Sequence, residues 1–126
     1  MARRVQPDER DKQRNNHPGM SREIGISASL VESTGIYSSI VRTPPGGTTR
    51  VHHHGDCETS IYILSGRARF TWGPAGTEHE LIADPGDFVY IPAGEIHVES
   101  NVSLTEPLEV LVTRNCSEPV TVIVDE

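Results

Sequence analysis

GDFVYIPAGEIHVESN, residues 86–101, combines two short strand-like segments with a tight turn and one histidine. Phe88 to Ile91 is apolar and aromatic, a composition that favours strands. Pro92-Ala93-Gly94 ends this segment, because proline donates no hydrogen bond to a sheet and glycine accommodates a turn. A second strand is expected from Ile96 and carries His97. The stretch therefore predicts a strand, a turn and a strand that presents an imidazole.

Similar segments continue on both sides of this stretch, separated by turn residues such as Pro44-Pro45-Gly46-Gly47 and Gly73-Pro74-Ala75-Gly76. No window of about 11 residues has a convincing helical period. About eight to ten short strands at this spacing indicate one all-β sandwich or barrel. The expected strands cover residues 36–43, 48–54, 59–64, 67–72, 78–83, 88–91, 96–102, 107–113 and 120–124.

Three consecutive histidines lie on the expected strand at residues 48–54. Alternate residues of a strand share a face, so His52 and His54 point the same way and His53 points the opposite way. Two imidazoles on one face suit zinc or a transition metal. If the strands close into one barrel, His97 joins this pair. The alternative is an exposed polar strand without a ligand.

At these residues the chain resembles the cupin superfamily. The second cupin motif, Gly-x5-Pro-x-Gly-x2-His-x3-Asn, matches residues 86–101 at every fixed position. The first motif, Gly-x5-His-x-His-x3–4-Glu-x6-Gly, matches from Gly46 through the histidines to Glu58, and then Gly66 comes one residue late. The resemblance implies a double-stranded β-helix, the jelly-roll or cupin barrel, as one all-β domain.

The resemblance also implies one divalent metal ion, Fe, Mn, Ni, Co or Zn, held by His52, His54 and His97. The late Gly66 leaves the fourth ligand open. Counted forward from the histidines, Glu58 has the family spacing and is the favoured ligand. Counted back from Gly66, the glutamate position is Thr59, so Glu58 reaches the metal only through a bulge between residues 58 and 61. The alternatives are water and Cys57, whose thiolate is an ordinary ligand for zinc or iron.

Arg50 is one candidate for contact with a substrate. It has the parity of His52 and His54, so it either lines the barrel and holds an anionic substrate or stands in water at the rim.

Glu99 is the other catalytic candidate. It shares a face with His97 and Asn101, and it is either a general base near the metal or a partner that orients a histidine ring. His17 and His79 have no such context and are expected to be solvated.

The resemblance says more about fold and metal than about the reaction, because this fold hosts many unrelated functions. Small cupins with this ligand set include dioxygenases, decarboxylases, isomerases and lyases, so a small-molecule metalloenzyme is the favoured hypothesis. The alternative is a non-catalytic module that binds a small molecule or the metal. A DNA-binding regulator is disfavoured, because Pro7, Pro18 and Gly19 break any helix in residues 1–30. The intact histidine trio disfavours a metal-free carbohydrate-binding or epimerase-like cupin.

Charge and composition divide the chain. Residues 1–22 hold six Arg or Lys against three acids, and residues 23–126 hold five against fifteen, which together give the net charge of −7. The first segment has only Val5 and Met20 as sizeable aliphatic side chains, so we interpret residues 1–22 as a flexible extension and residues 23–126 as the barrel domain. The acidic domain argues against nucleic acid as a partner.

No apolar run approaches the ~20 residues that a membrane span requires, and the N-terminus lacks the apolar stretch of a signal peptide. We therefore expect a cytoplasmic protein with no membrane partner, in which Cys57 and Cys116 are reduced thiols. Small cupins commonly pair through their strands or sheets, so a homodimer is expected. The expected ligand is a small molecule, and Arg50 favours an anionic one.

Overall fold

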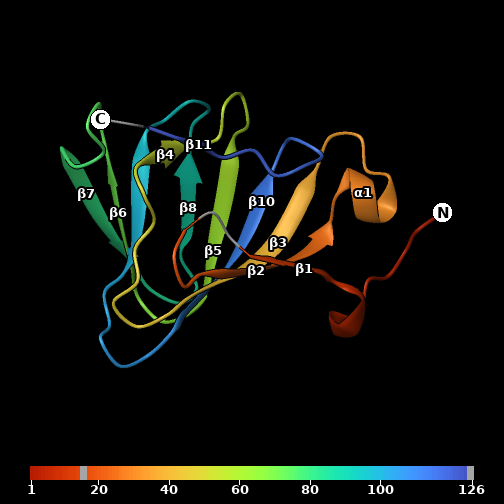
Figure 1. Ribbon diagram of the computed structural model, residues 1–126, viewed down its shortest axis with the longest axis horizontal. Coiled ribbons are helices and arrows are strands. Elements are labelled where there is room, and N and C mark those ends of the chain that lie inside the picture. The colour runs from red at the N-terminus through yellow and green to blue at the C-terminus, as the bar shows by residue number, and fades with distance from the viewer. Residues whose placement is uncertain (15–16, 125–126) are drawn as a thin grey trace.

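The computed structural model describes residues 1–14 and 17–124, and two antiparallel sheets make up most of it (Figure 1). The all-β prediction is confirmed. The six-stranded sheet has the order β1-β2-β3-β10-β5-β8, and the five-stranded sheet has the order β11-β4-β9-β6-β7. The strands are β1 (Asp11–Arg14), β2 (Ser21–Ile26), β3 (Tyr37–Thr43), β4 (His52–His53), β5 (Thr59–Ser65), β6 (Ala68–Trp72), β7 (His79–Ala83), β8 (Phe88–Ile91), β9 (His97–Asn101), β10 (Leu108–Arg114) and β11 (Val122–Ile123).

Helical structure is confined to two short segments of the described chain, a 3-10 turn, η1 (Pro7–Glu9), and one turn of α-helix, α1 (Ala28–Val31). The Ser27 side chain caps α1 by accepting a hydrogen bond from the backbone N–H of Leu30. Neither segment is long and apolar enough to cross a membrane.

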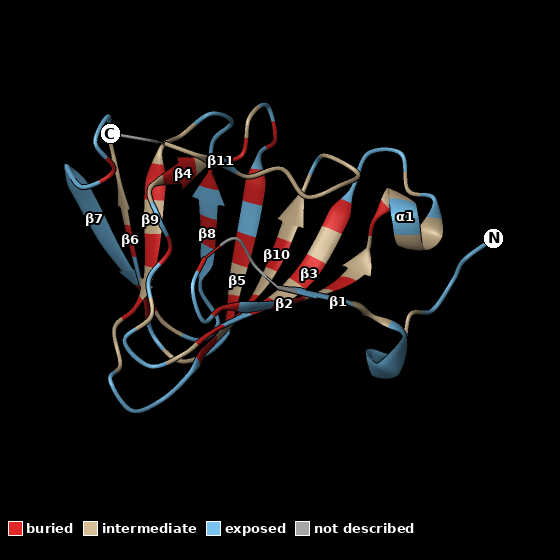
Figure 2. Ribbon diagram, viewed as in Figure 1, coloured by how far each residue is buried: buried red, intermediate tan, exposed pale blue. Residues whose placement is uncertain are grey.

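Alternation along the strands forms the core. In β3, β5 and β10 every second residue is buried over most of the strand, which Figure 2 shows as alternating bands. Ile63 and Val110 of the larger sheet and Phe70 of the smaller one are almost wholly buried. Burying a side chain of this kind stabilises the fold by about 1.5–3 kcal/mol.

Asn101 closes the motif that ends β9, and it holds backbone together. Its Nδ2 donates to the carbonyl oxygens of Thr43, Pro44 and Glu106 at 3.3, 3.2 and 2.8 Å. Its Oδ1 accepts the backbone N–H of Ser103 at 2.9 Å. A buried side chain that satisfies several backbone groups at once fixes the loops around it.

The N-terminal segment packs more closely than its composition predicts. Strand β1 pairs with β2, which in turn pairs with β3, so residues 11–14 extend the six-stranded sheet. Met20 belongs to the buried core and His17 is 4% exposed. Two side chains of the segment that we interpreted as an extension are therefore buried, and β2 runs through the predicted boundary at residue 22. The flexibility of the extension stays a prediction.

Cys57 and Cys116 form a disulfide, so the expectation of reduced thiols is wrong. Strand pairing explains it. Thr59 of β5 lies opposite Arg114 of β10 in an antiparallel register, so Cys57, two residues before Thr59, faces Cys116, two residues after Arg114. Their Cα atoms are 5.8 Å apart, within the usual range for a disulfide. The expectation of reduced thiols followed from the expected cytoplasmic location, and the register of β5 on β10 cannot be derived from the sequence alone.

Candidate metal centre

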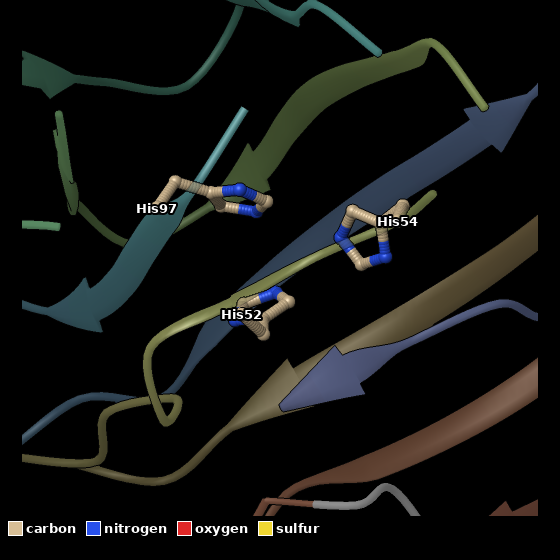
Figure 3. A group of neighbouring side chains, drawn as sticks. All are labelled: His52, His54 and His97. Atoms are coloured by element: carbon tan, nitrogen blue, oxygen red, sulfur yellow. The ribbon is translucent and has the colours of Figure 1, made fainter. Parts of the chain in front are cut away.

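Neighbouring strands bring three histidine rings together. His52 of β4 lies opposite His97 of β9, and His54 follows directly after β4. The ring centroids of His52 lie 4.3 Å from those of His97 and 4.8 Å from those of His54, and the last pair is 5.1 Å apart. All three side chains are buried, and one nitrogen from each lies within 4.8 Å of the others. Figure 3 shows the three rings gathered at this point.

Backbone carbonyls determine the tautomer of each ring. The Nδ1 atoms of His52, His54 and His97 lie 2.7, 2.7 and 2.8 Å from the carbonyl oxygens of Arg50, Val120 and Glu95. A carbonyl oxygen only accepts, so each Nδ1 carries the hydrogen and donates it. Each Nε2 therefore keeps its lone pair. Metal-ligating histidines in proteins are oriented by the same kind of contact.

The same three rings are neutral at neutral pH. Burial lowers the pKa of His52 to about 3, with His97 acting in the same direction. Burial and the nearby charge of Arg114 lower the pKa of His54 to about 2. Burial also lowers the pKa of His97. Neutral imidazole is the form that binds metal ions, so the donor set fits a divalent cation.

His53 lies outside the group, as its parity predicts. Its Nδ1 accepts the backbone N–H of Gly55 at 3.0 Å, and the ring is half-buried.

The histidines line a cavity of about 40 Å³. One water needs about 10–15 Å³ on this measure, so the space suits an ion with a few small ligand atoms. The polar side chains that share the lining are those of His17, Arg22, Ser39, Thr49, Glu99, Arg114 and Thr121.

Arg114 lines this cavity together with Arg22, and sequence reasoning missed its place there. Its Nε donates to the hydroxyl of Thr59 at 3.1 Å, and its Nη2 lies 3.3 Å from Nε2 of His54. Burial lowers the pKa of Arg114 to about 10, so the guanidinium stays charged at neutral pH. The signal was present in β10, where Arg114 has the parity of the buried Val110 and Val112.

Glu99 lines the cavity beside His97, which agrees with its predicted face. The side chain is 7% exposed, and its Oε1 has no hydrogen-bond partner among the described residues. Burial raises the pKa of Glu99 to about 7, while the charge of Arg114 acts in the opposite direction. A buried carboxyl with a free oxygen is suited to contact a ligand or to hold a proton.

The structure does not bring Glu58 to the histidines. Its carboxylate is exposed, with Oε1 accepting from the hydroxyl of Tyr90 at 2.6 Å and Oε2 accepting from Nδ2 of Asn115 at 3.0 Å. The bulge that Glu58 would need is absent here, because its backbone N–H bonds the Asn115 side chain and Thr59 already faces inward. The disulfide removes Cys57 as a ligand.

Arg50 is exposed and does not line the cavity. Only residues 52–53 of the expected strand at 48–54 are extended and paired as a strand, and Val51 forms a bend, so the parity that linked Arg50 to His52 does not hold.

The two remaining histidines differ from each other. His79 is exposed on β7, as expected. The expectation that His17 is solvated is wrong, because it is buried against the cavity with its ring centroid 4.7 Å from that of His52. Burial and the charge of Arg50 lower the pKa of His17 to about 4.

Comparison with known proteins agrees with this arrangement. A family model described as a cupin domain matches residues 39–114, and no curated protein matches the sequence. The solved structure of Lactobacillus farciminis oxalate decarboxylase in a formate complex is 21% identical, with a TM-score of 0.78 over 93% of this chain and 34% of that one. A variant of Bacillus subtilis oxalate decarboxylase is 27% identical, with a TM-score of 0.75 over 86% of this chain and 29% of that one.

A further structure concerns the Mn(II) centres of Bacillus subtilis oxalate decarboxylase, and it is 25% identical with a TM-score of 0.77. It matches 92% of this chain and 30% of its own, so the chain spans about a third of the length of these structures. The family model covers more than half of the chain and contains His52, His54, His97 and Arg114. The chain belongs to the cupin family, and its two antiparallel sheets form the jelly-roll barrel of that family.

Proposed function

We propose that this cupin binds one divalent metal ion through His52, His54 and His97 and acts on a small anionic ligand held at that ion. The observation that carries the proposal is the common orientation of the rings. Each Nδ1 is committed to a backbone carbonyl, so each buried Nε2 keeps its lone pair toward one ion, and that of His54 accepts from Arg114, which the ion would displace. Three protein ligands leave coordination positions open, as in catalytic metal sites. When bound, the ion would supply a Lewis acid that binds and polarises the ligand.

Histidine nitrogens suit Fe, Mn, Ni, Co and Zn, so the donor set alone does not select the metal. Manganese is the first ion to test, because oxalate decarboxylase of Bacillus subtilis has this fold and contains Mn(II) centres.

Charge and volume favour a small anion. The metal would add to the positive charge of Arg114 and Arg22, which both line the cavity, and among the described residues no carboxylate joins the three histidines in their group. At about 40 Å³ the cavity suits a ligand of very few atoms, such as formate or another small carboxylate. A formate complex is known for oxalate decarboxylase of Lactobacillus farciminis.

Turnover requires a group that moves a proton near the ligand, and we assign this role to Glu99. The carboxyl lines the same cavity, and its Oε1 has no partner among the residues that the structure describes. Arg114 would hold and orient the anion. These roles fit a decarboxylase, and the dioxygenase, isomerase and lyase classes use the same kinds of group.

Metal analysis followed by turnover tests the proposal. Full-length protein is stripped with a chelator and titrated with Mn(II), and binding is followed by electron paramagnetic resonance. One tight site per chain is expected. The loaded protein is then assayed with oxalate for the release of carbon dioxide and formate. Binding without turnover of any small carboxylate would favour the non-catalytic binding module, and the absence of a tight site would overturn the proposal.

We further propose a homodimer, because β8 is an edge strand with exposed aromatic side chains. Phe88 and Tyr90 are 74% and 61% exposed, and Leu81 and Ile82 of β7 are also exposed. Exposed apolar groups on an edge strand favour association. Light scattering on the purified chain should give twice the monomer mass, and Phe88→Ser should lower it.

The cytoplasmic location stays a proposal. Disulfides are rare in that compartment, so the bond between Cys57 and Cys116 argues against it, and trapping the thiols of both cysteines at cell lysis tests the location directly. Free thiols would support the proposal, and an intact disulfide would count against it.

A further inference from the structure

His17 reaches the metal cavity from outside the segment that matches the cupin model, which begins at residue 39. The pairing of β1 with β2 runs to Arg14 and Ser21, and His17 lies in the connection between them. Met20, three residues on, is buried in the core and anchors this connection. The N-terminal hairpin therefore delivers one imidazole to a site that the barrel otherwise builds.

The tautomer of His17 is opposite to that of the other three rings. The backbone N–H of Arg50 donates to Nδ1 of His17 at 3.0 Å. A nitrogen that accepts carries no hydrogen, so the neutral ring bears its hydrogen on Nε2. His52, His54 and His97 each present a lone pair, whereas His17 presents a donor.

This difference separates His17 from the metal ligands. A cation needs a lone pair, and in His17 the lone pair accepts a backbone N–H, that of Arg50, which the fold fixes in place, whereas the donor at Nε2 of His54 is the side chain of Arg114, which a metal ion would displace. The ring lies beside His52, with centroids 4.7 Å apart, and its Nε2 has no hydrogen-bond partner among the described residues. A neutral N–H beside a metal site is suited to bind an oxygen that the metal also holds.

We infer that His17 is a ligand-binding residue of this site, which donates a hydrogen bond from Nε2 to an oxygen of the small anion bound at the metal. The inference rests on the proposed function. His17 and Arg114 then contact the anion as two donors of different charge, and the N-terminal hairpin becomes part of the binding site.

The test uses full-length protein, Mn(II) and formate. Water-proton relaxation reports Mn(II) binding, and formate reduces the relaxation enhancement when it displaces water from the ion. His17→Ala should bind Mn(II) within about twofold of the wild type and formate about tenfold more weakly, since a hydrogen bond to a charged ligand is lost. His17→Gln retains an N–H donor and should restore at least part of the affinity. His79→Ala, an exposed histidine on β7, is the matched control and should bind both as the wild type does.

Three results would overturn the inference. Unchanged formate affinity in His17→Ala would show that the ring makes no contact with the anion. Equal loss of Mn(II) and formate would assign His17 to the metal or to the fold. A His17→Gln variant as weak as His17→Ala would exclude the role of a donor.

A measurement on the metal-free protein distinguishes a failure of this inference from a failure of the proposed function. Long-range proton–nitrogen correlation spectra of the metal-free protein identify which ring nitrogen carries hydrogen, and His17→Ala assigns the signal by its loss. The Nε2–H form is expected, and the Nδ1–H form would overturn the inference. If the wild type binds no Mn(II), the proposed function fails while the tautomer still decides whether His17 is a donor.

Discussion

Arg114 contacts the nitrogen of His54 that a metal ion would use, with Nη2 3.3 Å from Nε2. The guanidinium donates to that lone pair, because Nδ1 of His54 already donates to the carbonyl of Val120. Thr59, which accepts from Nε of Arg114, is at the position where counting back from Gly66 places the family glutamate. A cation therefore lies where a carboxylate was expected. Metal binding must displace the Arg114 guanidinium from the lone pair of His54. The displaced guanidinium can then bind an anion.

Replacing Arg114 should separate metal affinity from anion affinity. Arg114→Met retains much of the length of the side chain and removes its charge, so Mn(II) should bind several-fold more tightly because a competing donor and a like charge are gone. Formate should bind at least about tenfold more weakly. Relaxation titrations measure both affinities. Arg69→Met, on the exposed face of β6, is the control. A loss of Mn(II) affinity in Arg114→Met would contradict this account.

Each of the three histidines should be required for the metal. His52→Gln, His54→Gln and His97→Gln each remove one Nε2 lone pair and should purify with little Mn(II), while His53→Gln keeps a full complement because its ring lies outside the group. Elemental analysis of the four variants gives the stoichiometry. Loss of metal in His53→Gln with retention in His52→Gln would show that the register of β4 is shifted by one residue.

Glu58→Gln should leave Mn(II) affinity unchanged. The carboxylate contacts Tyr90 and Asn115 at the surface, and an exposed interaction of this kind contributes below about 1 kcal/mol. Titration with Mn(II) measures the metal affinity, and urea unfolding measures the stability. A marked fall in Mn(II) affinity would return Glu58 to the ligand set and would require the chain near residue 58 to rearrange on metal binding.

The metal-free protein should lose stability as the pH falls from about 6.5 to 4. Burial lowers the pKa of His17, His52, His54 and His97, so below pH 6.5 the unfolded chain takes up protons that the folded chain does not. Glu99, whose pKa is raised to about 7, acts in the opposite direction, because the folded chain takes up its proton first. The combined effect of the four histidines on the free energy of unfolding exceeds the opposite effect of Glu99.

Urea unfolding at pH 7 and pH 5 measures the change. The free energy of unfolding should fall by at least about 2 kcal/mol between these values, and the fall should be smaller in His54→Gln. Constant or rising stability on acidification would be incompatible with neutral buried rings.

The fold and the three histidines could be predicted because they depend on local patterns. Strand alternation separated His53 from its neighbours, and the turn at residues 92–94 placed His97 at the start of a strand. Arg114 could also be predicted, since it continues the inward face of Val110 and Val112, but a half-buried cation in a cavity contradicts the usual preference of arginine for the surface.

Other residues depend on contacts that no local pattern records. The pairing of Cys57 with Cys116 follows from the register of β5 on β10, which only the fold supplies. His17 stands alone in a polar segment, and its burial follows from the hairpin of β1 and β2. Glu58 was misplaced by counting from the histidines across a loop, where strand parity does not apply.

The disulfide has a topological consequence for the metal site. The bond between Cys57 and Cys116, 59 residues apart in sequence, closes a covalent ring that contains His97 and Arg114. His17, His52 and His54 lie in the tail that precedes the ring. Strand β3 of the tail pairs with β10 of the ring along its whole length, whereas β4 pairs with β9 only through His52 and His97. A metal ion shared by His52, His54 and His97 would therefore fasten the β4 end of the tail to the ring. A protease cut between His54 and Cys57 would leave two pieces that the pairing of β3 with β10 still joins, and at the β4 end the bound ion would be an added link that a chelator removes.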